Sequence, residues 1–364
     1  MKVGVACGGT GGHVFPGLAT AVELRKRGHD VVLWLSGRDI ESVSTGGWDG
    51  RIVKVKAGGL PSGFSLSAVA AGAHLASAFL ASVRRMRREP PNVLLAMGSY
   101  ASVGPVLAAR VLRIPVVLHE ANAVPGRAIC VLARFAVTVA VTFESSARYL
   151  AGRRVAVTGL PVRGGLDARF EEGVLRPGLF TVLVMGGSLG AHRVNEIAAE
   201  AMCRLHRAGR PVQVIHLTGA ADETMVGSLY AEAGVPHMVF GFLKEMGKAY
   251  HAADLAICRA GAASCMELAV CGVPSLLVPL PSAMRDHQTA NAQEMKRAGG
   301  ADVMAEKDLT ADRLVEYIEG RRADRHGLAG MKEALKRIAV DGAAARLADL
   351  VEQAAAGRSR RRDS

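Results

Sequence analysis

Residues Cys258 to Asn291 read CRAGAASCMELAVCGVPSLLVPLPSAMRDHQTAN, and the order of elements in this stretch decides the fold class. Its first residue ends an apolar strand, and a turn of small residues follows at Arg259 to Ala262. A short helix comes next, and Gly272 and Pro274 end it, as these residue types commonly do. A second apolar strand over Ser275 to Pro279 completes a strand–helix–strand unit, which is typical of an α/β protein with a parallel sheet.

The same unit predicts a ligand site. Small residues let a ligand approach the backbone, and the start of a helix offers N–H groups to an anion. Glu267, in the middle of the helix, could accept hydrogen bonds from both hydroxyls of a ribose. A polar loop is predicted over Arg285 to Asn291, and the amides of Gln288 and Asn291 suit the hydroxyls of a sugar. A nucleotide at one end and a sugar at the other indicate a nucleotide-sugar site.

Length and composition predict a two-domain α/β protein. The chain has 364 residues, half of them apolar, which is too long for one typical core. Its formal net charge is +12, but only 4% of the residues are aromatic, so nucleic-acid bases would find little to stack on. Because no nucleic-acid motif appears either, we expect no nucleic acid and instead an anionic membrane surface or a polyphosphate substrate.

Cysteine usage and hydropathy predict the compartment. The six cysteines show no CxxC or zinc spacing and lie in apolar stretches, so we expect buried free thiols in a reducing cytoplasm. No signal peptide opens the chain, and the most membrane-like run, 68–83, is shorter than the ~20 residues that span a bilayer. We therefore expect a protein that is soluble or rests on a membrane without crossing it.

A glycine-rich turn lies in the first βαβ unit. A strand is predicted over Lys2 to Ala6, the turn over Cys7 to His13, and a second strand over Asp30 to Leu35, after a helix. The turn is not the dinucleotide fingerprint, because Val14 stands where the third glycine belongs, and it lacks the ending of a Walker loop. It is either a phosphate cradle or only a tight connection.

Candidate proton acceptors lie near two predicted strand ends. His13 begins the first helix, where the helix dipole disfavours imidazolium, so it is either a neutral general base or a residue that caps the turn. His119, Glu120 and Asn122 fall at the carboxyl end of another strand, where ligands bind in open α/β sheets.

Apolar residues recur at helical spacing from 66 to 83 and lead into four arginines, Arg84, Arg85, Arg87 and Arg88. The arginines complement the C-terminal end of a core-packed helix, or they form a basic and apolar surface on anionic lipid.

The pattern of strands and helices restarts after a predicted hinge, Gly159 to Arg163. A strand over Phe180 to Met185 precedes a third glycine-rich turn, Gly186 to Ala191. We therefore predict two Rossmann-like, doubly wound domains that face each other across a cleft. Their expected bounds are 1–162 and 163–342, with a helix at 343–356 that packs back on the first domain. A basic tail is expected at 357–364, and within it Arg358 to Arg362 are expected to be disordered.

Six segments carry a family pattern along nearly the whole chain. They read GGTGGHVFPGLA (8–19), GSYASVGP (98–105), HEANAVPG (119–126), GLPVR (159–163), GGSLGAHRVN (186–195), and RAGAASCMELAVCGVPSLLVP with DHQTANA (259–292). In this order they resemble the MurG-type N-acetylglucosaminyltransferases of peptidoglycan synthesis. The resemblance implies the GT-B glycosyltransferase fold. It also implies inverting transfer of N-acetylglucosamine from UDP-GlcNAc to the 4-hydroxyl of the muramoyl sugar of undecaprenyl-linked lipid I, giving lipid II.

The resemblance also implies a role for each matched residue. Glu267 would bind the ribose, the backbone at Phe242 and Leu243 the uracil, and Ser188 with its turn the diphosphate. Further donor contacts would come from Thr10, Gly11, Gly12, Asn122, Arg163, Ala262, Ala263, Ser264, His287, Gln288 and Asn291. The acceptor would contact Gly8, Gly9, Gly98, Tyr100 and Ser102. Three residues depart from common family motifs, Ser99, Leu160 and Leu189, and His287 stands where some members carry Gln.

A metal-free displacement is the expected mechanism. N–H groups and a helix dipole would stabilise the charge that grows on the departing UDP. The chain contains no Asp-x-Asp, so no cofactor is expected to be required, although Mg²⁺ could assist the diphosphate. His13 is the first candidate for the base and Glu120 the second.

The expected partners are UDP-GlcNAc, lipid I, an anionic membrane surface at the cytoplasmic face of the inner membrane, and other cell-wall synthesis proteins. Three alternatives stay open: a UDP-GlcNAc 2-epimerase of the same fold, a nicotinamide oxidoreductase, and a non-catalytic nucleotide-sugar-binding protein.

Overall fold

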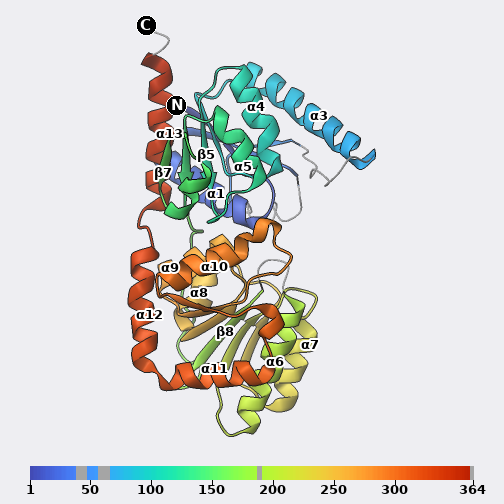
Figure 1. The fold of residues 1–364 in the computed structure, drawn as a ribbon, viewed down its shortest axis with the longest axis vertical. Coiled ribbons are helices and arrows are strands. Elements are labelled where there is room, and N and C mark those ends of the chain that lie inside the picture. Colours follow the sequence, from blue (N-terminus) through green and yellow to red (C-terminus); the bar gives the residue numbers. More distant parts are fainter. Residues whose placement is uncertain (38–46, 56–65, 187–190, 361–364) are drawn as a thin grey trace. The chain divides into compact units, whose positions relative to one another are not determined.

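The computed structural model describes residues 1–37, 47–55, 66–186 and 191–360 (Figure 1). They form two compact units: unit 1 comprises Met1–Arg163 with Val340–Ser364, and unit 2 comprises Gly164–Ala339. The boundary between the units thus lies after Arg163, where we expected 162, and the chain returns to unit 1 at Val340, where we expected 343.

Unit 1 contains a parallel sheet of seven described strands in the order β3-β2-β1-β4-β5-β6-β7. Register is fixed by pairs such as Val3 with Val31 and Val3 with Val93 on the two sides of β1. The strands are β1 (Lys2–Ala6), β2 (Asp30–Leu35), β3 (Arg51–Lys54), β4 (Val93–Ala96), β5 (Val116–Glu120), β6 (Thr138–Val141) and β7 (Val155–Val157). The order of the first six is that of a Rossmann fold, which confirms the predicted doubly wound unit.

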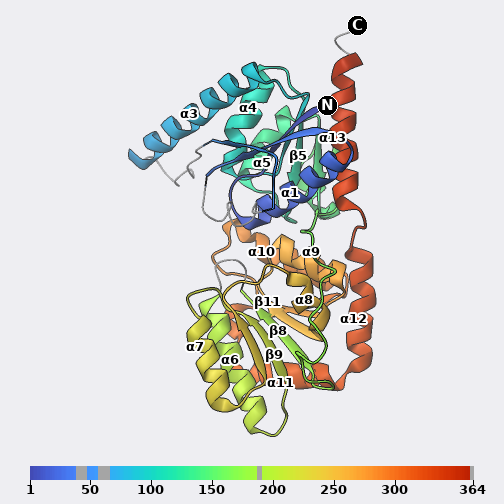
Figure 2. The ribbon, with the colours of Figure 1, turned by 180° about the vertical axis from the view of Figure 1, so that it is seen from behind.

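Helices cover both faces of this sheet (Figures 1 and 2). One buried core joins the sheet to α1 and α13, and another joins it to α3, α4 and α5. The bounds are α1 (Gly11–Lys26), α3 (Leu66–Arg88), α4 (Val103–Val111), α5 (Arg127–Leu132) and α13 (Ala343–Arg360), with short 3-10 helices η1 (Tyr100–Ser102), η2 (Ala133–Phe135) and η3 (Glu144–Tyr149). Because α13 continues to Arg360, the disorder predicted for Arg358 to Arg362 is wrong for 358–360, and 361–364 lie outside the described residues.

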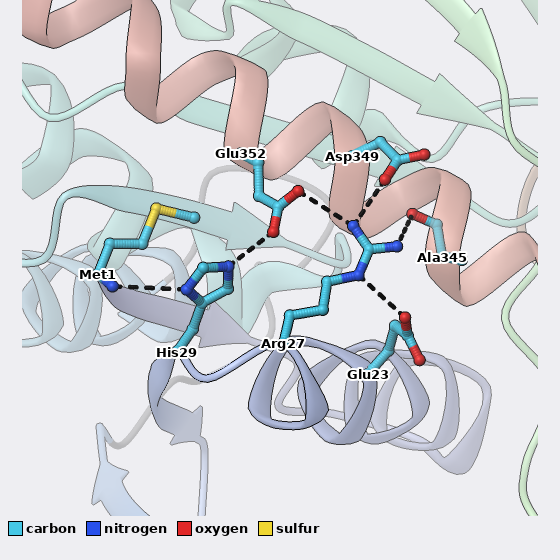
Figure 3. A network of polar contacts seen from close by, with 7 residues as sticks. All are labelled: Met1, Glu23, Arg27, His29, Ala345, Asp349 and Glu352. Carbon is cyan, nitrogen blue, oxygen red and sulfur yellow. Dashed lines mark hydrogen bonds and ion pairs between the residues drawn. The ribbon is translucent and has the colours of Figure 1, made fainter.

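Polar contacts add to the apolar packing of α13 on unit 1 (Figure 3). The Arg27 guanidinium contacts Asp349 at 2.6 Å, Glu352 at 3.0 Å and the carbonyl oxygen of Ala345 at 3.2 Å. His29 Nε2 lies 2.7 Å from Glu352. The carboxylates around Arg27 raise the pKa of its guanidinium, with the hydrogen bond to Asp349 as the largest cause. The last helix is therefore held to the first by charge as well as by its buried side chains.

Unit 2 repeats the same strand order, β10-β9-β8-β11-β12-β13, in a second parallel sheet. Its strands are β8 (Thr181–Met185), β9 (Gln213–Leu217), β10 (His237–Phe240), β11 (Leu255–Cys258), β12 (Ser275–Leu277) and β13 (Ala301–Val303). Its helices are α6 (His192–Arg207), α7 (Glu223–Ala233), α8 (Met246–Ala252), α9 (Ala262–Cys271), α10 (His287–Arg297), α11 (Ala311–Ala323) and α12 (Arg325–Ile338), with η4 (Met284–Asp286) and η5 (Glu306–Asp308). The apolar sides of α6, α7 and α11 share one core with the sheet.

The polar loop predicted over Arg285 to Asn291 is wrong. The chain forms the 3-10 turn η4 and then enters α10, so that His287, Gln288 and Asn291 are helical.

The expectation of six buried cysteines is also wrong for Cys130, which is exposed, while Cys271 is half-buried.

Two further findings concern membranes and metals. Among the residues that the structure describes, no helix combines the length and the apolar character needed to cross a bilayer. In the same residues, no group of three His, Cys, Asp or Glu side chains is arranged to hold a metal ion.

Candidate functional site

The strand order changes direction between β1 and β4 in unit 1 and between β8 and β11 in unit 2, and ligands of such folds bind at these switch points. The turns that follow β1, β4 and β11 are glycine-rich and small-residue turns of the sequence, whereas most of the glycine-rich stretch after β8, 187–190, lies outside the described residues. The candidate site of each unit is therefore built from these turns and the helices that follow them.

The two turns of unit 1 are packed against each other. The Ser99 hydroxyl donates a 2.6 Å hydrogen bond to the carbonyl oxygen of Gly8 and accepts one of 3.1 Å from the Ala101 N–H. Ser99 has φ +61°, a conformation that costs about 1–3 kcal/mol for a residue other than glycine. These two hydrogen bonds explain how serine is tolerated there. Ser102, a predicted acceptor contact, is fully buried, and its hydroxyl lies against the carbonyl oxygens of Ala6 and Gly98.

His13 lies in the first turn of α1, between the two glycine-rich turns of unit 1. Its Nδ1 is 3.1 Å from the hydroxyl of Thr10, the residue that precedes the helix. A Cβ added to Gly98 would lie 3.6 Å from the ring, and one added to Gly9 would lie 3.7 Å from Nδ1. The structure thus brings the predicted base together with Thr10, Gly9 and Gly98.

Glu120, the second candidate base, ends β5 and is almost fully buried. One carboxylate oxygen accepts hydrogen bonds from the backbone N–H and the side-chain amide of Asn122, at 2.8 and 3.0 Å. The other accepts one of 2.9 Å from the Gly126 N–H. This arrangement suits a residue that shapes the loop and orients Asn122, more than one that takes a proton from a substrate.

His119 is fully buried beside Glu120, and its Nε2–H donates a 3.0 Å hydrogen bond to the carbonyl oxygen of Gly159. No hydrogen-bond partner of its Nδ1 is found among the described residues. Burial is the main cause that lowers the pKa of His119 to about 4, and nearby His13 lowers it further. His119 is therefore neutral at pH 7 and connects β5 to the segment that follows β7.

Arg163 and Tyr100, two other predicted contacts in unit 1, are both half-buried. The Arg163 guanidinium is 4.2 Å from the centre of the Phe15 ring on α1, a cation–π contact. Tyr100 opens η1 and is half-buried.

In unit 2, Glu267 lies in the middle of α9 and is 2% exposed. Its Oε2 accepts a 2.8 Å hydrogen bond from the hydroxyl of Tyr250 on α8. Sequence reasoning missed Tyr250, because nothing in the pattern of α8 distinguishes this tyrosine from an ordinary core residue.

Gln288 and Asn291 contact the two turns that precede α10. The fully buried Asn291 donates a 3.1 Å hydrogen bond to the carbonyl oxygen of Ala260, in the turn after β11. Gln288 Oε1 accepts one of 3.0 Å from the Leu280 N–H, after β12. His287, the first residue of α10, is half-buried. Both amides therefore hydrogen-bond to the turns after β11 and β12. Their contact with a sugar stays a prediction.

Arg259 also holds this region together and was not predicted as a site residue. It is 8% exposed, its Nη1 donates hydrogen bonds of 3.3 Å to the carbonyl oxygens of Val278 and Pro279, and its Nη2 pairs with Glu306. The end of β11 is thereby joined to the chain after β12. Removal of the Glu306 carboxylate would leave the charge of the buried Arg259 without its partner, which is costly.

The start of α9 has the properties of an anion site. Gly261 precedes the helix in an extended conformation, and Ala262, Ala263 and Ser264 form its first turn without an acidic residue. The first N–H groups of a helix lack acceptors within the helix and lie at its positive end. The first turn of α1, with Gly11 and Gly12, likewise has no acidic residue.

For two other predicted donor contacts, Phe242 and Leu243, the structure gives the exposure of the side chain. Phe242, which follows β10, is 51% exposed, and Leu243 is half-buried. Ser188 lies outside the described residues.

Family models match most of the chain. The model of the glycosyltransferase family 28 N-terminal domain matches residues 3–141, and that of the family 28 C-terminal domain matches residues 181–351.

Two curated relatives match nearly their whole length. Both are named UDP-N-acetylglucosamine--N-acetylmuramyl-(pentapeptide) pyrophosphoryl-undecaprenol N-acetylglucosamine transferase. The protein of Myxococcus xanthus is 37% identical over 354 residues, which cover 96% of this chain and 92% of the relative. That of Thiobacillus denitrificans is 39% identical over 359 residues, which cover 96% of each.

Solved structures are similar over the same length. The crystal structure of Acinetobacter baumannii MurG has a TM-score of 0.77 at 29% identity and covers 97% of this chain and 99% of its own. The calicheamicin glycosyltransferase CalG4 has a TM-score of 0.71 at 16% identity, covers 97% and 98%, and shows likeness of fold alone.

Proposed function

The chain belongs to the MurG-type transferases of glycosyltransferase family 28, and we infer that it transfers N-acetylglucosamine from UDP-GlcNAc to undecaprenyl-pyrophosphoryl-N-acetylmuramyl-pentapeptide. The observation that carries this function is the identity of 37–39% over 96% of the chain to transferases of that name. The GT-B fold predicted from the sequence is confirmed by the same family and by the MurG structure. The product is lipid II, a precursor of peptidoglycan, so the protein contributes to cell-wall synthesis and, we propose, to cell division and cell shape.

For the donor, we propose that unit 2 binds the UDP moiety at its switch point. The first turn of α9, with Ala262, Ala263 and Ser264, would receive the diphosphate, because helix starts bind anions. Glu267 would accept the ribose hydroxyls, and the exposed Phe242 with Leu243 would contact the uracil. Gln288, Asn291 and His287 would face the sugar from α10. Thr10, Gly11, Gly12, Asn122, Arg163 and Ser188 stay predictions as further donor contacts.

For the reaction, we propose a single inverting displacement. The 4-hydroxyl oxygen of the muramoyl sugar forms a bond to the anomeric carbon of the donor, and the bond from that carbon to the UDP oxygen breaks. His13 takes the proton of the hydroxyl, and UDP leaves with the electron pair. The support for His13 is its place between the turns of Gly9 and Gly98, where the acceptor is predicted to lie. We propose the tautomer whose Nδ1–H donates to the Thr10 hydroxyl, because Nε2 then carries no proton before the reaction and would take the one from the substrate.

The first test is transfer of radiolabelled N-acetylglucosamine from UDP-GlcNAc to a short-chain lipid I analogue, with and without EDTA. We expect labelled disaccharide in both cases, because we propose that no metal cofactor is required. Product that is lost with EDTA would contradict only the metal-free mechanism. Epimerised sugar without disaccharide would favour the 2-epimerase, solved structures of which share the fold at 11–14% identity. Tight binding without chemistry would favour a binding protein.

For the membrane, we propose that α3 contacts anionic lipid at the cytoplasmic face of the inner membrane, where lipid I and other cell-wall synthesis proteins would be met. Leu80 is 55% exposed, and Arg84, Arg87 and Arg88 are exposed near it along the helix. Exposed apolar and basic side chains on one helix favour binding to an anionic surface.

Replacing Arg84, Arg87 and Arg88 together by Gln should weaken binding to anionic vesicles about 100-fold, since each arginine near such a surface contributes about 1 kcal/mol. Arg85→Gln is the matched control, because Arg85 is half-buried and 3.3 Å from Glu89 in an ion pair. Vesicle sedimentation at low and high salt measures both variants. Wild-type binding by the triple variant would remove α3 from the membrane contact.

A further inference from the structure

Tyr250 is a residue that the proposed function does not use, although it contacts the proposed ribose site. It lies on α8, is 2% exposed, and its hydroxyl donates a 2.8 Å hydrogen bond to Glu267 Oε2. We propose that Tyr250 is a positioning residue for the donor. Its hydroxyl fixes the Glu267 carboxylate in the orientation that accepts the ribose hydroxyls of the uridine nucleotide. The proposal rests on the function proposed above, which places the ribose at Glu267.

The surroundings of Glu267 explain why its carboxylate needs such a partner. Its neighbours on α9, from Cys265 to Ala269, are buried and otherwise apolar. A carboxylate in such surroundings must be hydrogen-bonded, and a bond to an ionised acceptor is roughly twice as strong as a neutral one. The charge is also felt by the Cys271 thiol, whose pKa is raised to about 11, chiefly by burial and further by Glu267.

The alternative acceptor for the Tyr250 hydroxyl is much weaker. The sulfur of Met185, the last residue of β8, lies 3.8 Å from the hydroxyl oxygen. A thioether is a weak acceptor, so the hydroxyl proton is directed to Glu267. Tyr250 therefore contacts both the last residue of β8 and the middle of α9, the helix that follows β11 at the switch point of unit 2.

The hydrogen bond to Tyr250 is compatible with ribose binding. An ionised carboxylate has two oxygens with about four acceptor positions, so it can accept one bond from Tyr250 and others from two neighbouring hydroxyls. Burying a glutamate restricts several rotatable bonds, and a side chain that is ordered before the ligand arrives has less freedom to lose on binding. Tyr250 would thus add to affinity for the ribose without touching the nucleotide.

Calorimetric binding of UDP and of 2′,3′-dideoxyuridine diphosphate tests this inference. We expect the wild-type protein to bind UDP about 10- to 100-fold more tightly than the dideoxy analogue. Tyr250→Phe removes one hydroxyl and should reduce this preference at least about fivefold. Tyr230→Phe is the matched control, because Tyr230 is also fully buried in unit 2 but its hydroxyl lies 2.9 Å from His216. It should keep the wild-type preference.

The outcomes separate the inference from the function on which it rests. If Tyr250→Phe still prefers UDP over the dideoxy analogue as strongly as the wild-type protein does, the positioning role is overturned and the ribose site is left intact. If the wild-type protein shows no preference for UDP over the dideoxy analogue, the ribose site is overturned, and the positioning role with it. The same follows if Glu267→Gln keeps the wild-type preference for UDP. A merely structural Tyr250 would weaken both ligands equally.

A second measurement is available should Tyr250→Phe not fold. In wild-type protein carrying ¹³C at the tyrosine Cζ, the Tyr250 resonance can be assigned by substituting the other four of the five tyrosines one at a time. It should shift when UDP binds and stay in place when the dideoxy analogue binds. Equal shifts with both ligands would overturn the inference.

Discussion

His13→Ala is expected to lower the turnover of the transferase by about 10²- to 10⁴-fold while binding of UDP-GlcNAc is retained. This is the range that a positioned general base commonly contributes. Donor binding should survive because Phe242, Glu267 and the first turn of α9, which we propose as the contacts of the uracil, ribose and diphosphate, belong to unit 2, whereas His13 belongs to unit 1. Turnover with the soluble lipid I analogue and calorimetric donor binding measure the two quantities separately.

A second substitution distinguishes loss of the base from loss of packing. His13→Asn places an amide near the position of Nδ1, which lies 3.1 Å from the Thr10 hydroxyl, but supplies no group that accepts a proton near pH 7. It should therefore be as inactive as the alanine variant. His326→Ala, at an exposed position of α12, controls for the general cost of removing a histidine.

Near-wild-type turnover in His13→Asn would exclude His13 as the base and reduce it to a residue that packs the turn. Glu120 would then be the next candidate, although its two oxygens already accept three N–H groups of its own loop. A carboxylate in that position would have to give up loop contacts before it could take a proton. The hydrogen bonding therefore favours His13 before any kinetic measurement.

The fold was predictable from the sequence because strands of a parallel sheet are buried on both faces and appear as continuous apolar runs. This holds for the central strands β1, β4, β8 and β11. It fails at the edges: β3 is mostly exposed, and β13 has only three residues, so neither produces such a run. The first half of α10 was predicted as a loop because its residues are polar, although Asn291 is fully buried.

The candidate site was predictable in its residue types and much less in its contacts. The glycine-rich turns and Glu267 were found because their chemistry is local in sequence. Tyr250 and Glu306 were missed, because they are brought to Glu267 and Arg259 only by tertiary packing across 17 and 47 residues of chain. Likewise, the motif HEANAVPG places Glu120 next to Asn122 but does not reveal that the carboxylate binds the loop's own N–H groups.

Removal of residues 343–364 is expected to unfold unit 1. The deletion removes α13, whose Leu347, Ala348 and Val351 are fully buried in the core that α1 and the sheet share. Burial of a leucine or valine side chain contributes about 1.5–3 kcal/mol, and the sheet residues beneath, such as Val5 and Leu95, would be exposed as well. The sum approaches the whole stability of a typical domain, about 5–15 kcal/mol.

Differential scanning calorimetry of the full chain and of the chain that ends at Gly342 measures this effect. The shortened chain should lose the unfolding transition of unit 1, and the ion pairs of Arg27 with Asp349 and Glu352 are lost in the same deletion. A chain that ends at Arg360 keeps all of α13 and should unfold like the full chain. If the shorter chain shows the unfolding transitions of both units at their wild-type temperatures, unit 1 folds without its last helix. If only the transition of unit 1 is lost and unit 2 still binds UDP, the C-terminal segment is a structural part of unit 1. In the sequence, unit 2 separates this segment from the rest of unit 1.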